Sequence, residues 1–184
     1  PKRFISSLSD NISKKRMEID VIKFRGPNLK HIDNRLMALQ LIEHDLSKVA
    51  MFDEKGEIIQ PSEVLHKKAL MVQRGSFRPP TLVNIDMFQC AQNKFLTEPS
   101  NQGIQTEVFM EITLSNLKSE GELNHADFLA RVDILNSLGF KVMISNYPEF
   151  YRLVNYLGRF TPNMIALVIG IPNLKEIFDE KYYE

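Results

Sequence analysis

From Lys67 onward, short apolar runs alternate with longer stretches in which apolar residues recur every three or four positions. The short runs are typical of buried β-strands, and the longer stretches are typical of amphipathic helices. The pattern predicts four strands, at Ala69–Gln73, Glu107–Leu114, Lys141–Ser145 and Met164–Ile169. It predicts a helix after each of them, at Thr81–Phe95, His125–Leu138, Glu149–Leu157 and Asn173–Lys181.

Four strand–helix units in succession predict parallel strands that are joined by right-handed crossovers. The predicted strands are apolar on both faces, as expected where helices cover both sides of a sheet. The sequence therefore predicts an α/β fold, a Rossmann-like open sheet of mainly parallel strands with helices on both faces. Half of a βα barrel has the same local pattern and remains an alternative.

Residues 1–66 have a different pattern, and we expect them to form a small N-terminal α+β lobe beside an α/β domain at residues 67–184. Pro1–Arg16 is polar and basic, which indicates an arm or one short helix. The chain has no initiator Met and ends on Asp-Glu-Lys-Tyr-Tyr-Glu, which leaves open whether it is part of a longer protein.

Three further elements are predicted in this lobe. The β-branched residues of Ile19–Phe24 predict a strand. Asp33 is suited to cap a helix that extends to Leu46. Two short apolar runs around Asp53–Gly56 predict a β-hairpin, which we expect to lie outside the parallel strands.

The turn between the first predicted strand and helix, at Gly75–Pro80, is the local pattern that most indicates chemistry. A strand, a glycine turn and a helix together aim backbone N–H groups and a helix N-terminus at an anion. Arg74 and Arg78 add two positive charges beside the turn. Arg74, Gly75, Ser76, Phe77 and Arg78 are therefore candidate phosphate-binding residues, and a purely structural role for the first three is the alternative.

The ten residues from Gly75 to Asn84, GSFRPPTLVN, resemble the first signature of the adenylyltransferase (nucleotidyltransferase) superfamily, roughly G-S-F-D-P-P-[HT]-x-G-H. In that family the loop follows the first strand of a Rossmann-like sheet, and the side chains at the positions of Thr81 and Asn84 bind nucleotide phosphates. Thr81 is an accepted variant, whereas Arg78, Val83 and Asn84 replace the Asp, Gly and His of the signature. Asparagine donates a hydrogen bond to phosphate but carries no imidazolium charge, so the resemblance implies nucleotide binding better than catalysis.

For an enzyme, the resemblance implies nucleotidyl transfer from ATP with Mg²⁺, and Thr81, Asn84 and Glu111 are the catalytic candidates. The wider chain also resembles bacterial proteins labelled nicotinate-nucleotide adenylyltransferase or TonB-dependent receptor, on the segments QPSEV, HADFLARVDIL and FDEKYYE. The alternative function is that of a non-catalytic, Rossmann-like module for regulation or assembly within a larger protein.

Ligands of such folds bind beyond the carboxyl ends of the strands. Asn116, Asn146 and Asn173 follow three of the predicted strands and are candidates for the ligand edge, although helix capping explains each of them separately. Glu111 interrupts an apolar strand, and a buried carboxylate needs a partner. We predict an ion pair with Arg74, which either fixes strand register or holds Arg74 toward a phosphate, with Glu111 as a possible general base.

Bulk properties limit the function classes. The formal net charge is zero, so no overall field attracts nucleic acid or an anionic membrane, and we expect neither as a partner. No apolar run approaches the ~20 residues that span a bilayer. The single cysteine, Cys90, fits a reducing cytoplasm, and its apolar neighbours predict a core position. No metal site is predicted, because the histidines have no ligand spacing: His31, His44, His66 and His125.

Overall fold

The computed structural model describes residues 2–11, 18–118 and 121–178. Residues 1 and 12–16 of the predicted N-terminal arm and residues 179–181 of the last predicted helix lie outside these ranges. The beginning of the arm is a helix, α1 (Lys2–Asn11).

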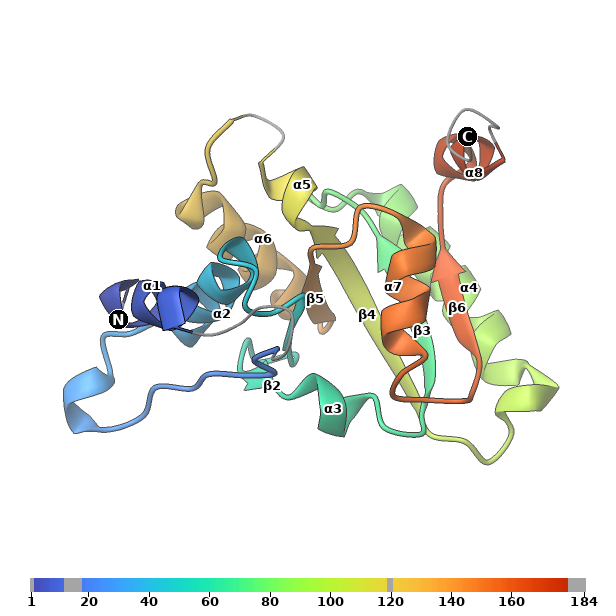
Figure 1. Cartoon of the computed structure of the whole chain (residues 1–184). Helices are drawn as coiled ribbons and strands as arrows, with labels where there is room; N and C mark the ends of the chain where they lie inside the picture. Colours follow the sequence, from blue (N-terminus) through green and yellow to red (C-terminus); the bar gives the residue numbers. More distant parts are fainter. Residues whose placement is uncertain (1, 12–17, 119–120, 179–184) are drawn as a thin grey trace.

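Among the described residues, six strands form one sheet in the order β2-β1-β5-β4-β3-β6 (Figure 1). Four of them run parallel, as predicted: β3 (Ala69–Arg74), β4 (Thr106–Thr113), β5 (Lys141–Ser145) and β6 (Ile165–Val168). The predicted hairpin is also present, as β1 (Val49–Phe52) and β2 (Ile58–Ile59). The protein is therefore an α/β protein with a mostly parallel sheet.

The hairpin does not stand apart from the parallel strands, because β1 pairs antiparallel with β5. All four residues of β1 are buried, so this strand needs cover on both faces and finds it as a member of the sheet. In the turn, Asp53 Oδ1 accepts hydrogen bonds from the backbone N–H groups of Lys55 and Glu57. Gly56 supplies the positive φ of 77° that the turn requires.

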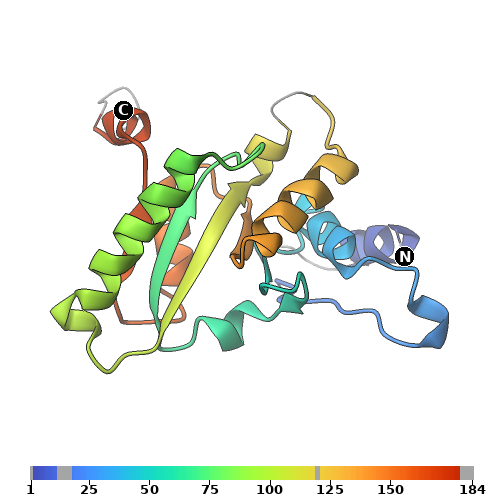
Figure 2. The same ribbon diagram turned by 180° about the vertical axis from the view of Figure 1, so that it is seen from behind.

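Helices cover both faces of the sheet, as predicted. One face is covered by α2 (Asn34–Glu43), α4 (Leu82–Thr97) and α6 (His125–Ser137), which lie in front in Figure 2. The other face is covered mainly by α7 (Phe150–Leu157). Successive residues of β3 alternate between the two cores, because side chains of a strand point to opposite faces.

The remaining elements are short, and they complete the connections between these layers. They are the 3₁₀ helices η1 (Pro27–Leu29) and η2 (Pro99–Asn101) and the helices α3 (Pro61–Val64), α5 (Leu114–Leu117) and α8 (Ile171–Ile177). The predicted helix that Asp33 caps is present as α2, where the Asp33 side chain accepts a hydrogen bond from Arg35 N–H. It ends at Glu43 rather than at Leu46, because Asp45 takes a positive φ of 58°.

Two predictions for individual segments are wrong. Ile19–Phe24 is not a strand. The side chains of Ile19, Ile22 and Phe24 pack in a cluster with α1 and α2, while the Asn34 side chain binds both backbone polar groups of Phe24. The apolar pattern there arises from packing on helices. Cys90 is exposed, because α4 turns Phe88 to the sheet and a residue two positions later faces away from it.

The strand order brings the carboxyl ends of β3 and β6 side by side (Figure 1). From β3 the chain proceeds to β4 and β5 on one side, and α7 then carries it across the other face to β6. The chain leaves β3 through α4 on the first face and reaches β6 through α7 on the second face. The direction in which successive strands are added to the sheet therefore reverses between β3 and β6.

Candidate functional site

Arg74 and Glu111 form the predicted ion pair. They stand opposite each other in the parallel register of β3 and β4, near the carboxyl ends of the strands. Arg74 Nε donates to Glu111 Oε2 at 2.7 Å and Arg74 Nη2 to Glu111 Oε1 at 2.9 Å, which is a bidentate arrangement. Ser145 Oγ donates to the same carboxylate from β5. The Glu111 side chain is 0% exposed and the Arg74 side chain 8%, so the pair is buried.

The rest of the guanidinium group holds the start of α7. Arg74 Nη2 donates to the carbonyl oxygen of Tyr147 at 2.8 Å, and Nη1 donates to that of Pro148. The guanidinium carbon lies 4.2 Å from the centre of the Phe150 ring. Arg74 thus forms four hydrogen bonds within the protein, and little of its donor capacity remains for a ligand. Of the two interpretations of the pair, these contacts favour the structural one.

Gly75 makes room for an aromatic ring. A Cβ atom at position 75 would lie 2.7 Å from atoms of the Phe77 ring, well inside van der Waals contact. Phe77 has a φ of 45° and is 2% exposed, so its ring turns back into the core over Gly75. The Gly75 N–H donates to the carbonyl oxygen of Glu111 at 3.0 Å. The glycine of the motif therefore serves the packing of the turn, and its amide is already bonded.

Arg131 of α6 ties the middle of the turn to the neighbouring helix. Its Nη1 donates to the carbonyl oxygen of Ser76 at 3.0 Å, and its Nη2 pairs with Asp127. Arg78 Nε also reaches Asp127, at 3.0 Å. Ser76 and Arg78 themselves are exposed. The turn is thus held in place by α6 while two of its polar side chains face outward.

Thr81 and Asn84 form a capping box at the start of α4. The Asn84 Oδ1 atom accepts hydrogen bonds from the Thr81 backbone N–H and from the Thr81 hydroxyl, both at 2.9 Å. The Asn84 N–H donates to Thr81 Oγ1 at 3.3 Å. The two candidates for phosphate contacts therefore bind each other. Leu82 and Val83, the first residues of α4, have no intrahelical acceptor for their N–H groups, and both are exposed.

The three candidate asparagines at the ligand edge are distributed along it. Asn116 lies in α5, where its N–H donates to Thr113 Oγ1, and the Asn146 N–H donates to the carbonyl oxygen of Lys48. Asn173 lies inside α8 rather than before it. They follow β4, β5 and β6, and neighbouring strands are about 4.8 Å apart, so β5 and β6 are separated by roughly 14 Å. The sheet does not gather the three residues at one point.

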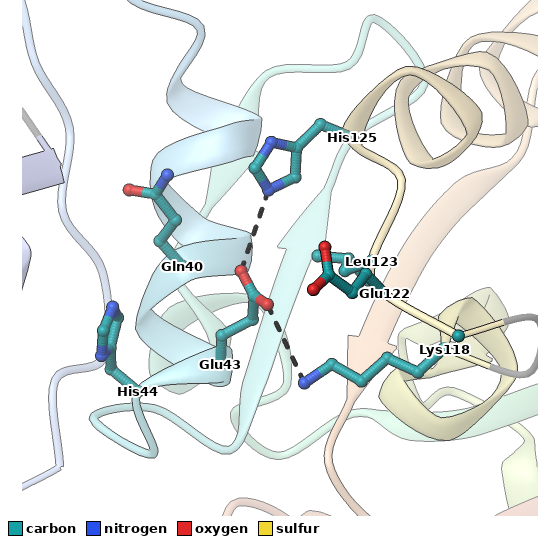
Figure 3. Close-up of a pocket in the computed structure, with 8 residues that line it drawn as sticks. Gln40, Glu43, His44, Lys118, Glu122, Leu123 and His125 are labelled. Atoms are coloured by element: carbon teal, nitrogen blue, oxygen red, sulfur yellow. Dashed lines mark ion pairs between the residues drawn. The ribbon is translucent and has the colours of Figure 1, made fainter.

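A cavity that the sequence did not indicate lies between α2 and α6, with a volume of about 740 Å³ (Figure 3). Glu43 at the end of α2 lies 3.8 Å from His125 Nε2 and 3.8 Å from Lys118 Nζ. The residues around the cavity are Gln40, Glu43, His44, Lys118, Gly121, Glu122, Leu123 and His125. They come from segments far apart in the chain, which is why spacing along the sequence gave no signal.

In residues 2–11, 18–118 and 121–178, no group of three or more His, Cys, Asp or Glu residues is arranged to hold a metal ion. None of the helices described there has the length and apolar character of a membrane span.

A scan against known protein families finds no match, and neither does a search of curated proteins or of solved structures. The contacts of this chain therefore carry the functional argument.

Proposed function

We propose that the protein binds a nucleotide or another phosphorylated small molecule at the carboxyl edge of the sheet, in front of the β3–α4 turn. The observation that carries this proposal is the reversal of strand order between β3 and β6. In open, doubly wound sheets of the Rossmann type, ligands bind in the crevice outside the carboxyl ends of the strands at that reversal. The turn with the phosphate-loop pattern follows one of these two strands.

Three groups at the turn are suited to hold the phosphate. The Ser76 hydroxyl and the Arg78 guanidinium group are on the exposed side of the turn. The first N–H groups of α4, at Leu82 and Val83, point out of a helix of 16 residues, whose N-terminus favours an anion. The resemblance of this loop to the nucleotidyltransferase signature supports the same class of ligand. Arg74 takes the supporting role of fixing the end of β3.

Nucleotidyl transfer is the reaction class for such a ligand, and ATP with Mg²⁺ is the cofactor to test. The described residues provide no group of three metal-binding side chains, so they do not fit Mg²⁺ without the phosphate oxygens of the nucleotide. The catalytic candidates Thr81 and Asn84 bind each other, and Glu111 is buried in its ion pair. Asn84 lacks the charge that a histidine offers to a transferring phosphate. We therefore expect binding with slow turnover or none.

The binding test uses calorimetry with ATP and ADP, with and without Mg²⁺. Arg78→Ala removes a charge-assisted hydrogen bond and should weaken binding by about 1.5–3 kcal/mol. Lys94→Ala, in the last turn of α4, is the matched control and should have no effect. Thr81→Ala should weaken binding less than Arg78→Ala. If no nucleotide binds, or if Arg78→Ala binds like the unchanged protein, the proposal is wrong.

The catalytic test measures pyrophosphate release from ATP with nicotinate mononucleotide and nicotinamide mononucleotide. We expect rates below ~1 s⁻¹, which is slow for an enzyme. Asn84→His should raise turnover with little change in affinity, because a charge there acts mainly on the transition state. Turnover of the unchanged protein at ~1 s⁻¹ or faster would show that the protein is an ordinary adenylyltransferase.

The second candidate function is that of a non-catalytic module for regulation or assembly. The observation that favours it is a set of exposed apolar side chains at α4 and α8, the helices that follow β3 and β6, and at Phe178 directly after α8. Leu82 is 88% exposed, Ile171 70% and Phe178 78%. If assembly is the function, Leu82→Ser and Ile171→Ser should lower the mass of the particle in light scattering and leave nucleotide affinity unchanged.

A further inference from the structure

The cavity between α2 and α6 is built by three segments that end or begin beside it. Glu43 is the last residue of α2, His125 is the first residue of α6, and Lys118 caps α5 (Figure 3). The volume of about 740 Å³ lies within the range of about 300–1,000 Å³ that is usual for small-molecule sites. Most of the lining residues carry polar or charged side chains, and their carbon atoms supply apolar surface beside the charged groups, so the cavity suits a small ligand with both charged and apolar parts.

The charged groups of the cavity are close together but not hydrogen-bonded. Glu43 lies 3.8 Å from both Lys118 Nζ and His125 Nε2, and hydrogen bonds of these groups are shorter than about 3.2 Å. Within the part of the chain that the structure describes, these three groups form only the two long pairs with one another, so each can take a shorter contact with a ligand. In Figure 3 the carboxylate of Glu122 is turned toward the space between Glu43 and Lys118, so a second acidic group faces the cavity. Donors and acceptors of both charges are thus available to one ligand.

The two helix ends reinforce this division of charge. The C-terminal end of α2 carries a partial negative charge and favours a cation. The N-terminal end of α6 carries a partial positive charge, and the Asn124 side chain already accepts hydrogen bonds from its Ala126 and Asp127 amides, so an anion there is held by the side chain of His125. Both ends border the same cavity. A ligand with a single charge satisfies only one of them.

We propose that this cavity binds a small zwitterion of the free amino acid type. The ammonium group of the ligand lies between two carboxylates, that of Glu43 at the end of α2 and that of Glu122 in the segment before α6. Its carboxylate accepts hydrogen bonds from Lys118 and from His125 at the start of α6. The ligand replaces the two long ion pairs of Glu43 with shorter, charge-assisted hydrogen bonds. This site is separate from the β3–α4 turn, so the nucleotide proposal and this one can fail independently.

The test is a titration of the full chain with the twenty free L-amino acids, followed by calorimetry and by amide chemical shifts in NMR spectra. We expect at least one amino acid to bind and to shift the amides of residues 121–126. The matching amine without the carboxylate, and the matching acid without the ammonium group, should each bind at least tenfold more weakly. Methylamine and acetate are such probes for glycine, and ethylamine and propionate are such probes for alanine.

Two variants test the roles of the charged groups. Glu43→Gln and Lys118→Gln should each weaken amino-acid binding at least tenfold, while circular dichroism confirms that the fold is kept. Glu98→Gln and Lys94→Gln, at the end of α4, are the matched controls and should bind like the unchanged protein. The proposal is overturned if no amino acid binds at millimolar concentration, if the amine binds as tightly as the amino acid, or if both cavity variants retain full affinity.

Discussion

Replacing Glu111 with alanine should destabilise the fold strongly. The carboxylate of Glu111 accepts two hydrogen bonds from Arg74 and one from Ser145, at a position without solvent exposure. The Glu111→Ala protein keeps the guanidinium group in the same buried place and removes the carboxylate that pairs with it. An uncompensated buried charge of this kind costs about 3–5 kcal/mol.

The contacts that Arg74 keeps in Glu111→Ala determine how much of the free energy of unfolding is lost. Arg74 still donates to the carbonyl oxygens of Tyr147 and Pro148 and still lies over the Phe150 ring. These groups stabilise the cation partly, so we expect a loss toward the lower end of that range. Glu111→Gln keeps an acceptor and the side-chain shape while it removes the charge. It should lose about 1.5–3 kcal/mol, the value of a hydrogen bond to a charged group.

Urea unfolding followed by circular dichroism measures both losses. With a slope of about 2 kcal/mol/M, a loss of 3–4 kcal/mol lowers the urea midpoint by ~1.5–2 M. The double variant Arg74→Met/Glu111→Leu removes both charges and should recover at least half of the loss, because buried pairs are often replaceable by apolar residues. A loss below ~1 kcal/mol in Glu111→Ala, typical of an exposed ion pair, would refute the reasoning.

Three other substitutions test the turn and α2. Gly75→Ala places a Cβ atom 2.7 Å from the Phe77 ring and should cost about 1–3 kcal/mol in the same urea assay; a smaller effect in the Phe77→Leu background would confirm the clash as the cause. Thr81→Ala removes the capping box and should cost ~1 kcal/mol, whereas Thr81→Ser should not. Burial raises the pKa of Asp33, but hydrogen bonds from Arg35 outweigh it and hold that pKa below its usual value. Asp33 thus contributes stability that is lost as pH falls below about 4, and Asp33→Asn should flatten the acid limb of stability against pH.

The parallel strands were predictable because a short apolar run between polar residues fits a buried strand and is too short for a helix. The middle of β5, Val142–Ile144, is apolar, is flanked by Lys141 and Ser145 and is too short for a helix, and the structure has the predicted bounds of Lys141–Ser145. The ion pair of Arg74 and Glu111 was predictable for a different reason. A buried carboxylate needs a partner, and Arg74 at the end of the neighbouring predicted strand was the obvious one; the structure then places the two residues opposite each other in register.

The errors share a physical cause, which is that apolar residues indicate burial but not the surface that buries them. Ile19–Phe24 packs against helices instead of a strand, and its backbone bonds to the Asn34 side chain and to Leu46. Residues around Cys90 are apolar, but the rotation of α4 about its axis decides which of them faces the sheet. Phe88 faces the sheet, so Cys90 does not. The cavity at Glu43 was beyond the sequence altogether, because three separate segments build it.

The occupied groups of the β3–α4 turn bear on where a ligand can bind. Phe77 fixes Gly75, Arg131 holds the carbonyl oxygen of Ser76, and Asn84 closes the helix start on Thr81. A turn held in this way loses little conformational freedom on binding, which favours affinity. The same contacts remove Arg74 and the Gly75 amide from the list of phosphate donors.

If a phosphate binds at this turn, as we propose, it should lie on the outer side, next to the first amides of α4 and to Arg78, which also pairs with Asp127. This placement differs from the one that the sequence motif suggested, because the motif gives equal weight to Arg74 and Arg78. The two arginines therefore distinguish the possibilities. If the outer placement is correct, Arg78→Lys should weaken nucleotide binding while leaving stability unchanged, since Arg78 is exposed and lysine cannot reproduce its fork geometry. Arg74→Lys should lower stability, because lysine cannot replace the bidentate contact with Glu111, and the affinity of the protein that remains folded should be unchanged.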